Sequence, residues 1–301
     1  MELLYKAQTR FLFHSHIKIK ISAFYEESIF DELFAILEHV DKKYNSYQAG
    51  SYFDIINKNS GSFVDVDKET VNILNQAITI SDFFNGTYDI TVMPLIRLWG
   101  FYKDEQRQTP SIKEIEDVKK LIDYRHIEIN GKKVKIKKGQ EIITGSFIKA
   151  YAVDRLTERM LELGINDAII NAGGSTIMAI NNESHLRWQV MVRHPQTEEV
   201  LFKLNIANQA YSTSSQSKTF VSIDGKEYGH ILNPITGFPS TNKQVGIISD
   251  KCMVGDMIST ALFNESAEGF LKKIDLLSEH YNIKGFMLDS DNNIIYTQDF
   301  R

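Results

Sequence analysis

Cysteine is almost absent from this chain, which contains one, Cys252, among 301 residues. A single thiol excludes an internal disulfide and any zinc site built from several cysteines, so the fold gains nothing from an oxidising compartment. Residues 1–10 also lack a basic stretch followed by an apolar run, and they contain no cysteine for lipid attachment. We therefore expect a cytoplasmic protein, and note that an exported lipoprotein that had lost its leader would show the same features.

Long apolar runs and an excess of basic residues are absent as well. No segment approaches the roughly 20 apolar residues that span a bilayer, which predicts a chain without a membrane span. The net charge of −5 argues against nucleic acid as the main partner. What remains is an ordinary globular composition, 43% hydrophobic and 24% charged, in a chain long enough to bury a sizeable core.

The spacing of apolar residues predicts interleaved strands and helices. Alternation predicts a strand over 11–23, with Ile17, Ile19 and Ile21 on one face. Helices are expected within the ranges 28–43, 68–84, 111–121, 145–164 and 255–263, and further strands at 168–170 and 188–193. Hairpins are expected around 130–131, 224–225 and 289–293. The aromatic, turn-rich segment 44–57 suits a surface loop.

The most informative stretch is a glycine-led turn at Gly145, the helix after it, and a strand that ends in Gly173-Gly174. The strand is apolar enough to be buried, so the glycine pair is expected to bring bare backbone N–H groups to the edge of a core, where a phosphate-bearing ligand could approach. The pair lacks the third glycine and the acidic residue of a dinucleotide fingerprint, and no phosphate-loop lysine–serine pair occurs. A Rossmann or P-loop enzyme is therefore disfavoured.

A pair of residues and two single residues are candidates for chemistry, and each has a plainer alternative. Asp256 and Thr260 stand four apart, which places a carboxylate and a hydroxyl, both suited to Mg²⁺, on one helix face; alternatively, Asp256 only caps the helix. His230 could act as a general base, since its ordinary pKa is near neutrality, or serve only the structure. Lys149, near a helix start where the dipole disfavours a cation, indicates an anionic neighbour or is a plain surface lysine.

Taken in order, seven stretches resemble the ApbE-type FAD:protein FMN transferases, and the resemblance runs from about Tyr44 to Phe263. They are Tyr47 with Ser51 and Asn57; Gly86–Thr91 with Trp99–Phe101; Lys149 with Tyr151–Asp154; Asn171–Gly174; Ser212–Ser214; His230–Gly237; and Asp256 with Ser259–Ala261.

The resemblance implies an Mg²⁺-dependent enzyme that transfers the FMN half of FAD to a threonine or serine of a target flavoprotein through a phosphoester bond and releases AMP. It implies that Asp256 and Thr260, with a backbone carbonyl near Ser146, hold the Mg²⁺ against the pyrophosphate, and that His230 assists deprotonation of the acceptor hydroxyl. The residues that it implies for binding or supporting the flavin nucleotide are Tyr47, Thr87, Tyr88, Asp89, Lys149, Asp154, Gly173, Gly174, Ser175 and Ser214.

The fold that the resemblance implies is α+β, with antiparallel-rich sheets backed by helices. We expect one domain over 1–301, undivided or built from two interleaved subdomains. Two intimate halves would leave a cleft between them that gathers the stretches around Lys149, Gly173, His230 and Asp256.

Four positions depart from the family pattern. Ala150 and Ser215 stand where glycine is usual, Ser175 where an acidic residue or asparagine is common, and Asn233 where aspartate is usual. The metal pair and His230 are intact, so the departures affect FAD binding less than transfer. Two alternatives stay open beside the transferase: a FAD pyrophosphatase with water as acceptor, which the same metal chemistry permits, and a non-catalytic protein that binds and delivers FAD, which the changes at Ser175, Ser215 and Asn233 would favour. The acceptor motif of such transferases is not evident in the chain, so its target is expected to be another protein.

Overall fold

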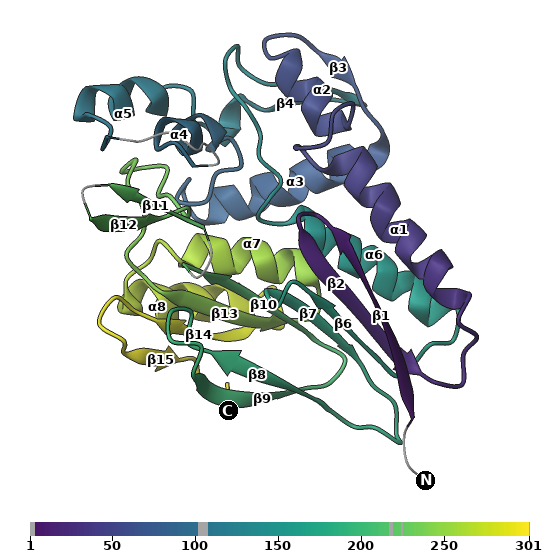
Figure 1. The fold of residues 1–301 in the computed structure, drawn as a ribbon. Helices are drawn as coiled ribbons and strands as arrows, with labels where there is room; N and C mark the ends of the chain where they lie inside the picture. The colour runs from purple at the N-terminus through teal and green to yellow at the C-terminus, as the bar shows by residue number, and fades with distance from the viewer. Residues whose placement is uncertain (1–3, 102–107, 217–218, 224, 301) are drawn as a thin grey trace.

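A computed structural model describes residues 4–101, 108–216, 219–223 and 225–300. Its largest sheet, here called the main sheet, has eight strands that all pair antiparallel, in the order β1-β2-β6-β7-β10-β13-β14-β15 (Figure 1). The strands are β1 (Tyr5–Leu12), β2 (Ser15–Ser22), β6 (Ala168–Ala172), β7 (Thr176–Ile180), β10 (Ala210–Ser215), β13 (Gln244–Ser249), β14 (Lys284–Leu288) and β15 (Ile294–Tyr296).

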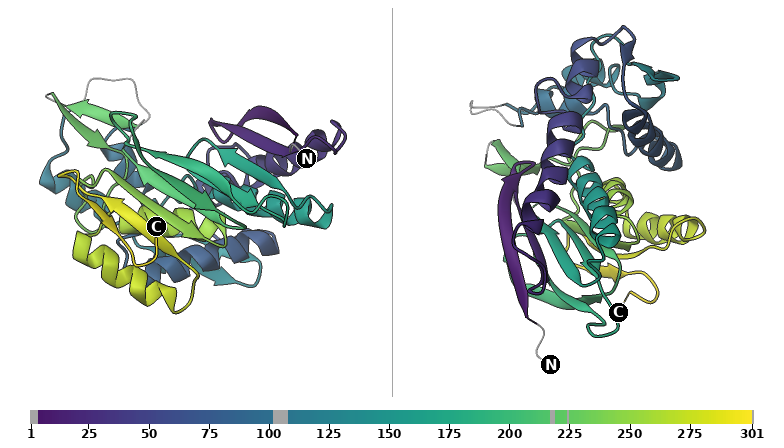
Figure 2. Two further views of the ribbon diagram at one scale, coloured as in Figure 1. Left: turned by 90° about the horizontal axis from the view of Figure 1, so that it is seen from below. Right: turned by 90° about the vertical axis from the view of Figure 1, so that its right-hand side faces the viewer.

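Helices cover one face of the main sheet, which we call the helical face (Figures 1 and 2). They are α1 (Ile29–Tyr44), α6 (Ile148–Glu162), α7 (Cys252–Leu262) and α8 (Ala267–Ser278). The core on this side includes Ile17, Ile19 and Ile21 of β2, each fully buried. Helix α7 packs against β10 and β13, the strands at the centre of the sheet. This packing fixes the side chains of α7 against the polar residues of β10.

The opposite face, which we call the outer face, carries the hairpin of β8 (Trp188–Arg193) and β9 (Val200–Ile206). A second hydrophobic core lies between the hairpin and the sheet, and contains Val190 and Val192 of β8 with Ile177 and Tyr211 of the main sheet. Side chains of β8 alternate between buried and exposed, so the strand lies with one side on the sheet and the other toward solvent.

A long insertion between β2 and β6 supplies the second half of the molecule, drawn at the top of Figure 1. After α1 it contains α2 (Tyr52–Lys58), β3 (Val64–Asp65), α3 (Lys68–Phe83), α4 (Met93–Leu98), α5 (Ile112–Lys119), η1 (Tyr124–His126), β4 (Glu128–Asn130) and β5 (Lys133–Lys135). The hairpin of β11 (Phe220–Ile223) and β12 (Lys226–Gly229) packs on this half, because Val221 and Ile223 share a core with Leu95, Ile96 and Ile115.

The α+β fold with antiparallel sheets is confirmed, and so are most of the predicted elements. Helices α1, α3 and α5 lie within a residue or two of the predicted ranges. Helix α3 begins after Asp67, whose carboxylate accepts a hydrogen bond from the backbone N–H of Thr70. Hairpins occur at β4–β5, β11–β12 and β14–β15, although Asp224 of the predicted second tip lies outside the described residues. None of the helices in the described ranges is both long and apolar enough to cross a bilayer.

Three expectations need correction. The strand predicted over 11–23 is a hairpin, because Phe13 and His14 take positive φ values of 51° and 56° and reverse the chain between β1 and β2. The segment 44–57 is a loop only to Ser51, whose side chain accepts from the N–H of Asp54 and starts α2. Helix α7 begins at Cys252, before the predicted start, so Asp256 lies inside the helix and does not cap it.

Candidate active site

One large cavity of about 1170 Å³ is lined by both halves of the molecule. Its walls contain the start of α6, the turn between β6 and β7, the end of β10, part of α7, and the Thr87–Ile90 turn of the insertion. The predicted site residues that line it are Tyr47, Thr87, Tyr88, Asp89, Ser146, Lys149, Gly173, Gly174, Ser175, Ser214, His230, Asp256 and Thr260. Residues from seven separate stretches of sequence thus meet in one place.

Asp256 and Thr260 project from α7 into this cavity. The carboxylate of Asp256 accepts a hydrogen bond from the hydroxyl of Thr176, with O···O distances of 2.9 and 3.2 Å. The hydroxyl of Thr260 donates to the backbone carbonyl of Asp256 one turn earlier, at 2.9 Å, and lies 3.0 Å from Oγ of Ser214. Because its proton is used within the helix, Oγ1 of Thr260 keeps lone pairs for another partner.

Burial raises the pKa of Asp256 from 3.8 to about 6, mainly because the carboxylate loses water and also because Asp154 lies nearby. The ammonium group of Lys149 opposes this rise. Burial destabilises the charged form of this carboxylate, and a bound cation would stabilise it. Among the described residues, no three or more His, Cys, Asp or Glu side chains form a group that could hold a metal ion by themselves, and the oxygen donors of Asp256 and Thr260 suit Mg²⁺ more than a softer metal. Magnesium therefore fits this donor set.

The glycine pair shapes the cavity differently from what the sequence predicts. Gly173 and Gly174 have φ values of 71° and 77°, and a Cβ on Gly173 would lie 2.0 Å from Oγ of Ser15, so glycine is required there. Their N–H groups are not bare: Gly173 donates to the carbonyl of His16, and Gly174 donates to the side chain of Asn171. The N–H groups of both glycines thus have partners within the chain, unlike the bare groups that the sequence predicts. The glycines instead let β2 approach the β6–β7 turn closely.

Lys149 supplies the positive charge that this turn lacks. It stands in the first turn of α6, and Nζ donates a hydrogen bond to Oγ of Ser175, directly after the glycine pair. Ser175 stands at the position where an acidic residue or asparagine is common in the family. Its hydroxyl accepts a hydrogen bond from Lys149. Lys149 and Asp256 lie close enough for the lysine to lower the carboxylate pKa. A pyrophosphate between them would contact the ammonium group directly.

His230 follows β12 and lines the same cavity. Its Nδ1 lies 3.1 Å from the carbonyl oxygen of Thr219, and since a carbonyl can only accept, Nδ1 carries the proton and Nε2 keeps a lone pair. Burial lowers the pKa of the imidazole, so the ring is neutral at pH 7. These are the properties that a general base requires.

The insertion contributes a wall whose polar groups are bonded to one another. The carboxylate of Asp89 accepts from the N–H and hydroxyl of Thr91, each at 2.7 Å, and from the N–H of Tyr124 at 2.9 Å. The hydroxyl of Tyr88 lies 3.1 Å from Oγ of Ser146, which joins this turn to the start of α6. We conclude that Asp89 fixes the shape of the turn, and that the turn presents its neighbours to the cavity.

Aromatic rings stand at the mouth of the cavity. Tyr47 is 41% exposed, and its ring packs edge-on against the imidazole of His14 with centroids 6.1 Å apart. Exposed rings of this kind can stack on a planar ligand. The sequence did not single out His14, because its approach to Tyr47 depends on the β1–β2 turn.

Asp154 does not line the cavity, although the resemblance implies a role in cofactor binding. It is buried, and its carboxylate accepts from the N–H groups of Cys252 and Met253 at 2.8 and 2.9 Å. These are orphan donors of the first turn of α7, so Asp154 caps that helix from α6. The residue supports the position of Asp256 and Thr260 from behind the wall.

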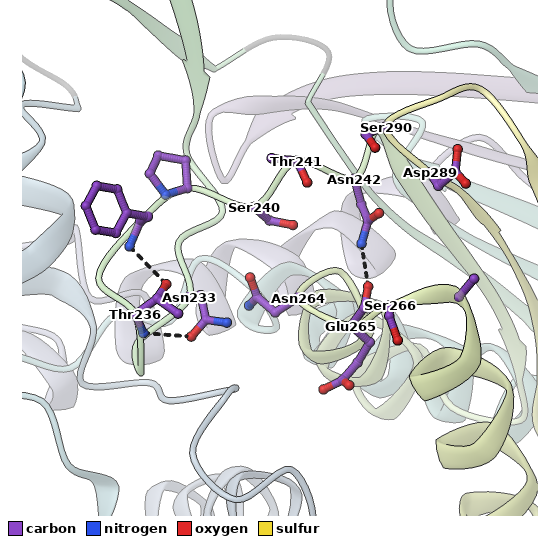
Figure 3. Close-up of a pocket in the computed structure, with 13 residues that line it drawn as sticks. Asn233, Thr236, Ser240, Thr241, Asn242, Asn264, Glu265, Ser266, Asp289 and Ser290 are labelled. Carbon is purple, nitrogen blue, oxygen red and sulfur yellow. Dashed lines mark hydrogen bonds between the residues drawn. The ribbon is translucent and has the colours of Figure 1, made fainter.

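A second, smaller cavity of about 410 Å³, drawn in Figure 3, shares the lining residue Asn264 with the large one. Polar side chains line it, among them Asn242, Asn264, Glu265 and Asp289. Asn233 also faces it, and its side chain accepts from the N–H groups of Ile235 and Thr236, a turn that asparagine forms as well as aspartate. The predicted site residues are not part of its lining, so we assign the chemistry to the large cavity.

Some contacts and lining residues of the site were not predicted. Thr176 bonds Asp256 across 80 positions of sequence, and residues 189–193 of β8 enter the lining from the outer face. No local pattern marks either, because the first contact depends on the β7–α7 packing and the second on where the β8–β9 hairpin docks.

The chain is similar to known proteins in sequence and in fold. The FAD:protein FMN transferase of Vibrio cholerae is 26% identical over 239 residues, which cover 77% of this chain and 71% of that protein. That of Buchnera aphidicola is 26% identical over 87% of this chain and 78% of its own length. The crystal structure of the ApbE protein from Thermotoga maritima superposes with a TM-score of 0.89 at 25% identity over 98% of both chains. The flavin transferase ApbE of Vibrio cholerae has the same fold, with a TM-score of 0.85 at 19% identity over 99% of both chains.

The family model described as the ApbE family matches residues 13–283. This span includes every residue of the cavity that the sequence analysis singled out. The chain belongs to the ApbE family.

Proposed function

We propose that this chain is an Mg²⁺-dependent FAD:protein FMN transferase, which attaches the FMN half of FAD to a serine or threonine of an acceptor flavoprotein and releases AMP. The names of its relatives support this activity. The observation that carries the proposal is the meeting of an oxygen-only donor pair, Asp256 and Thr260, with a neutral histidine in one cavity.

The residues divide the work as follows. Asp256 and Thr260, with a backbone carbonyl near Ser146, would hold the Mg²⁺, which supplies charge neutralisation and orientation for the two phosphates of FAD. The ammonium group of Lys149 binds the pyrophosphate from the β6–β7 side. Tyr47 stacks on the flavin at the mouth of the cavity.

His230 moves the proton. The oxygen of the acceptor hydroxyl forms a bond to the phosphorus of the FMN half, and its proton passes to Nε2 of His230. The bond between that phosphorus and the bridging oxygen breaks, and the electron pair leaves with AMP. The hydrogen bond from Nδ1 to Thr219 holds the ring in the tautomer that this step needs.

The test is to incubate the purified protein with FAD, Mg²⁺ and a protein that the Vibrio cholerae relative modifies, and to follow AMP, free FMN and protein-bound flavin by chromatography and mass spectrometry. We expect AMP together with protein-bound flavin, and loss of both in Asp256→Ala and in the presence of EDTA. Free FMN with AMP would instead indicate a FAD pyrophosphatase. Intact FAD in every sample, with FAD bound to the protein, would indicate a delivery protein.

A further inference from the structure

The large cavity extends beyond the catalytic residues onto the outer face of the main sheet. Besides the residues near Asp256, its lining includes Ile169, Ile177 and Tyr211, whose side chains belong to the outer-face core, and five consecutive residues of β8, Gln189–Arg193. At about 1170 Å³ the cavity exceeds the range of about 300–1,000 Å³ that holds a typical small ligand. The outer-face portion, here called the β8 groove, therefore leaves room for a second occupant.

One wall of the β8 groove is the edge of a strand. Strand β8 pairs with β9 on one side, and in the described part of the chain no strand pairs with its other side. Residues of β8 line the cavity in an unbroken run, whereas β9 contributes none, so the edge away from β9 faces the groove. In an antiparallel pair every second residue points its N–H and C=O away from the partner strand. The groove is thus edged by backbone groups that can pair with an added strand.

The floor of the groove holds buried polar atoms, one of them without a partner in the described residues. Oε1 of Gln244 is buried and accepts no hydrogen bond within the described residues, and the buried hydroxyl of Tyr211 has Thr213 as its neighbour; both residues line the cavity. Tyr211 is 2% and Gln244 5% exposed. An unsatisfied buried oxygen costs stability, and a ligand that supplies an N–H or O–H to it removes that cost.

The two ends of β8 have different surroundings. At its first residue, outside the lining, Trp188 donates from its indole to the carbonyl of Ile180 and packs against Tyr5 and His185. At the other end, β8 leads to His194, Pro195 and Glu198, which line the cavity together with Ser215 and His230. Five strand residues measure roughly 17 Å at about 3.3 Å each. A linear segment paired with β8 would thus lie in the same cavity as His230.

We propose that the acceptor protein docks by adding an extended segment to the free edge of β8, so that its serine or threonine hydroxyl reaches His230 while FAD occupies the rest of the cavity. This inference rests on the proposed transferase activity. It assigns the β8 groove to the acceptor, with backbone pairing for affinity and the outer-face side chains for sequence preference.

The first test uses a synthetic peptide that contains the modified serine or threonine of a protein that the Vibrio cholerae relative modifies, once its transfer by the wild-type chain is seen. Single backbone nitrogens on one side of the hydroxyl are methylated in turn. We expect kcat/KM to fall at least about 5-fold at every second position, because alternate N–H groups pair with β8. A loss without this alternation would overturn strand addition.

The second test blocks the groove from the protein side. Because Cys252 is completely buried, Met191→Cys introduces the one accessible thiol in the described chain, on a residue of β8 that is 51% exposed. After reaction with N-ethylmaleimide, KM for the intact acceptor should rise on the order of 10-fold or more, with an unchanged Kd for FAD and unchanged thermal unfolding. The matched control is Lys203→Cys, which lies directly across from Met191 on β9, is exposed, and is not part of the lining.

The outcomes separate this inference from the proposed function. If the wild type transfers no FMN to any acceptor, the proposed function fails first. If it transfers FMN and the blocked Met191→Cys variant does so with the wild-type KM, the β8 groove is not the docking site. If blocking instead weakens FAD binding, the groove holds part of FAD and the inference is wrong.

Gln244→Leu refines the assignment of the floor. Because Oε1 of Gln244 has no partner within the described residues, the substitution removes no hydrogen bond to that atom, and its main folded-state loss is a 3.3 Å bond from Nε2 to Thr213. We expect KM for the acceptor to rise about 3-fold to 10-fold with kcat and FAD affinity retained. An unchanged KM would remove Gln244 from the docking surface.

Discussion

The turn around Asp89 and the pair of elements α7 and β10 both line the active-site cavity, but they use their polar atoms differently. The carboxylate of Asp89 receives three hydrogen bonds, two of them from backbone N–H groups, whereas that of Asp256 has only the hydroxyls of Thr176 and Ser212 as hydrogen-bond partners within the described residues. Burial raises the pKa of both groups. Burial of a carboxylate therefore does not by itself indicate a functional site. The better indicator is a buried carboxylate whose oxygens can still accept a bond from a ligand or a metal ion.

The largest expected effect lies on the α7 side. Asp256→Asn should lower AMP release from FAD on the order of 10³-fold, because it removes the charged metal ligand from a phosphoryl transfer. Thermal unfolding without metal should be unchanged or shifted upward, since the substitution also removes a buried charge. A variant that retains activity at wild-type magnesium concentrations would break the comparison.

His230 belongs to the same open side, and its replacement comes next. His230→Gln should lower transfer about 100-fold while the Kd for FAD stays the same, because a general base contributes to the reaction and not to ligand binding. Equal loss of FAD binding would show that the ring holds the nucleotide instead. Rapid-mixing measurements of AMP release and equilibrium titration with FAD distinguish the two.

The pH profile gives His230 an independent signature. Burial lowers the pKa of the imidazole, so the neutral base persists below the ordinary value of about 6.5. Activity at saturating Mg²⁺ should therefore be level through neutral pH and fall only as the pH drops through this lowered pKa. In His230→Gln the limb that belongs to the imidazole should be missing. A limb at or above 6.5 would contradict the burial of the ring.

On the insertion side the expected effect is on stability. Asp89→Asn places an amide N–H₂ against the N–H of Tyr124 or the donors of Thr91, so at least one buried hydrogen bond is lost. We expect the free energy of unfolding to drop by about 1–3 kcal/mol in urea titrations, with kcat close to wild type in the folded fraction. If Asp89→Asn instead lowered AMP release as much as Asp256→Asn, Asp89 would act in catalysis and not only in the structure of its turn.

The smallest effect is expected at Ser175. Ser175→Ala removes the hydroxyl that receives the hydrogen bond from Lys149. The lysine keeps its charge, so KM for FAD should change only about 2-fold to 10-fold, in either direction as the ammonium group is freed or misplaced. A change beyond 100-fold would mean that Ser175 itself contacts FAD.

The sequence predicted what local patterns encode. A spacing of four places Asp256 and Thr260 on one helix face whatever residue starts the helix. The prediction that both lie on one face therefore did not depend on the predicted start of α7, which was wrong. The helices and hairpins were predicted because caps and turns depend on neighbours, as at Asp67 and at the β4–β5 turn. Order along the chain, through the resemblance of seven stretches, indicated a common site that no single stretch could show.

The rest was decided by partners far away in sequence. The N–H of Gly173 looked available for phosphate, but it pairs with the carbonyl of His16 on β2. Asp154 looked like a ligand contact, but its bonds are to Cys252 and Met253 almost a hundred positions later. The groove beside β8 depends on where a hairpin docks, which alternation within the strand cannot specify.

The place of β2 beside β6 also bears on how the chain acquires its structure. Ile17 pairs with Ala172, so this contact closes a loop of roughly 150 residues, and sequence-distant contacts of this kind form slowly. During synthesis the β1–β2 hairpin leaves the ribosome before β6, so the edge of β2 that pairs with β6 stays unpaired until β6 has been made. The N-terminal hairpin is therefore the segment that we expect chaperones to protect while the rest of the enzyme is being made.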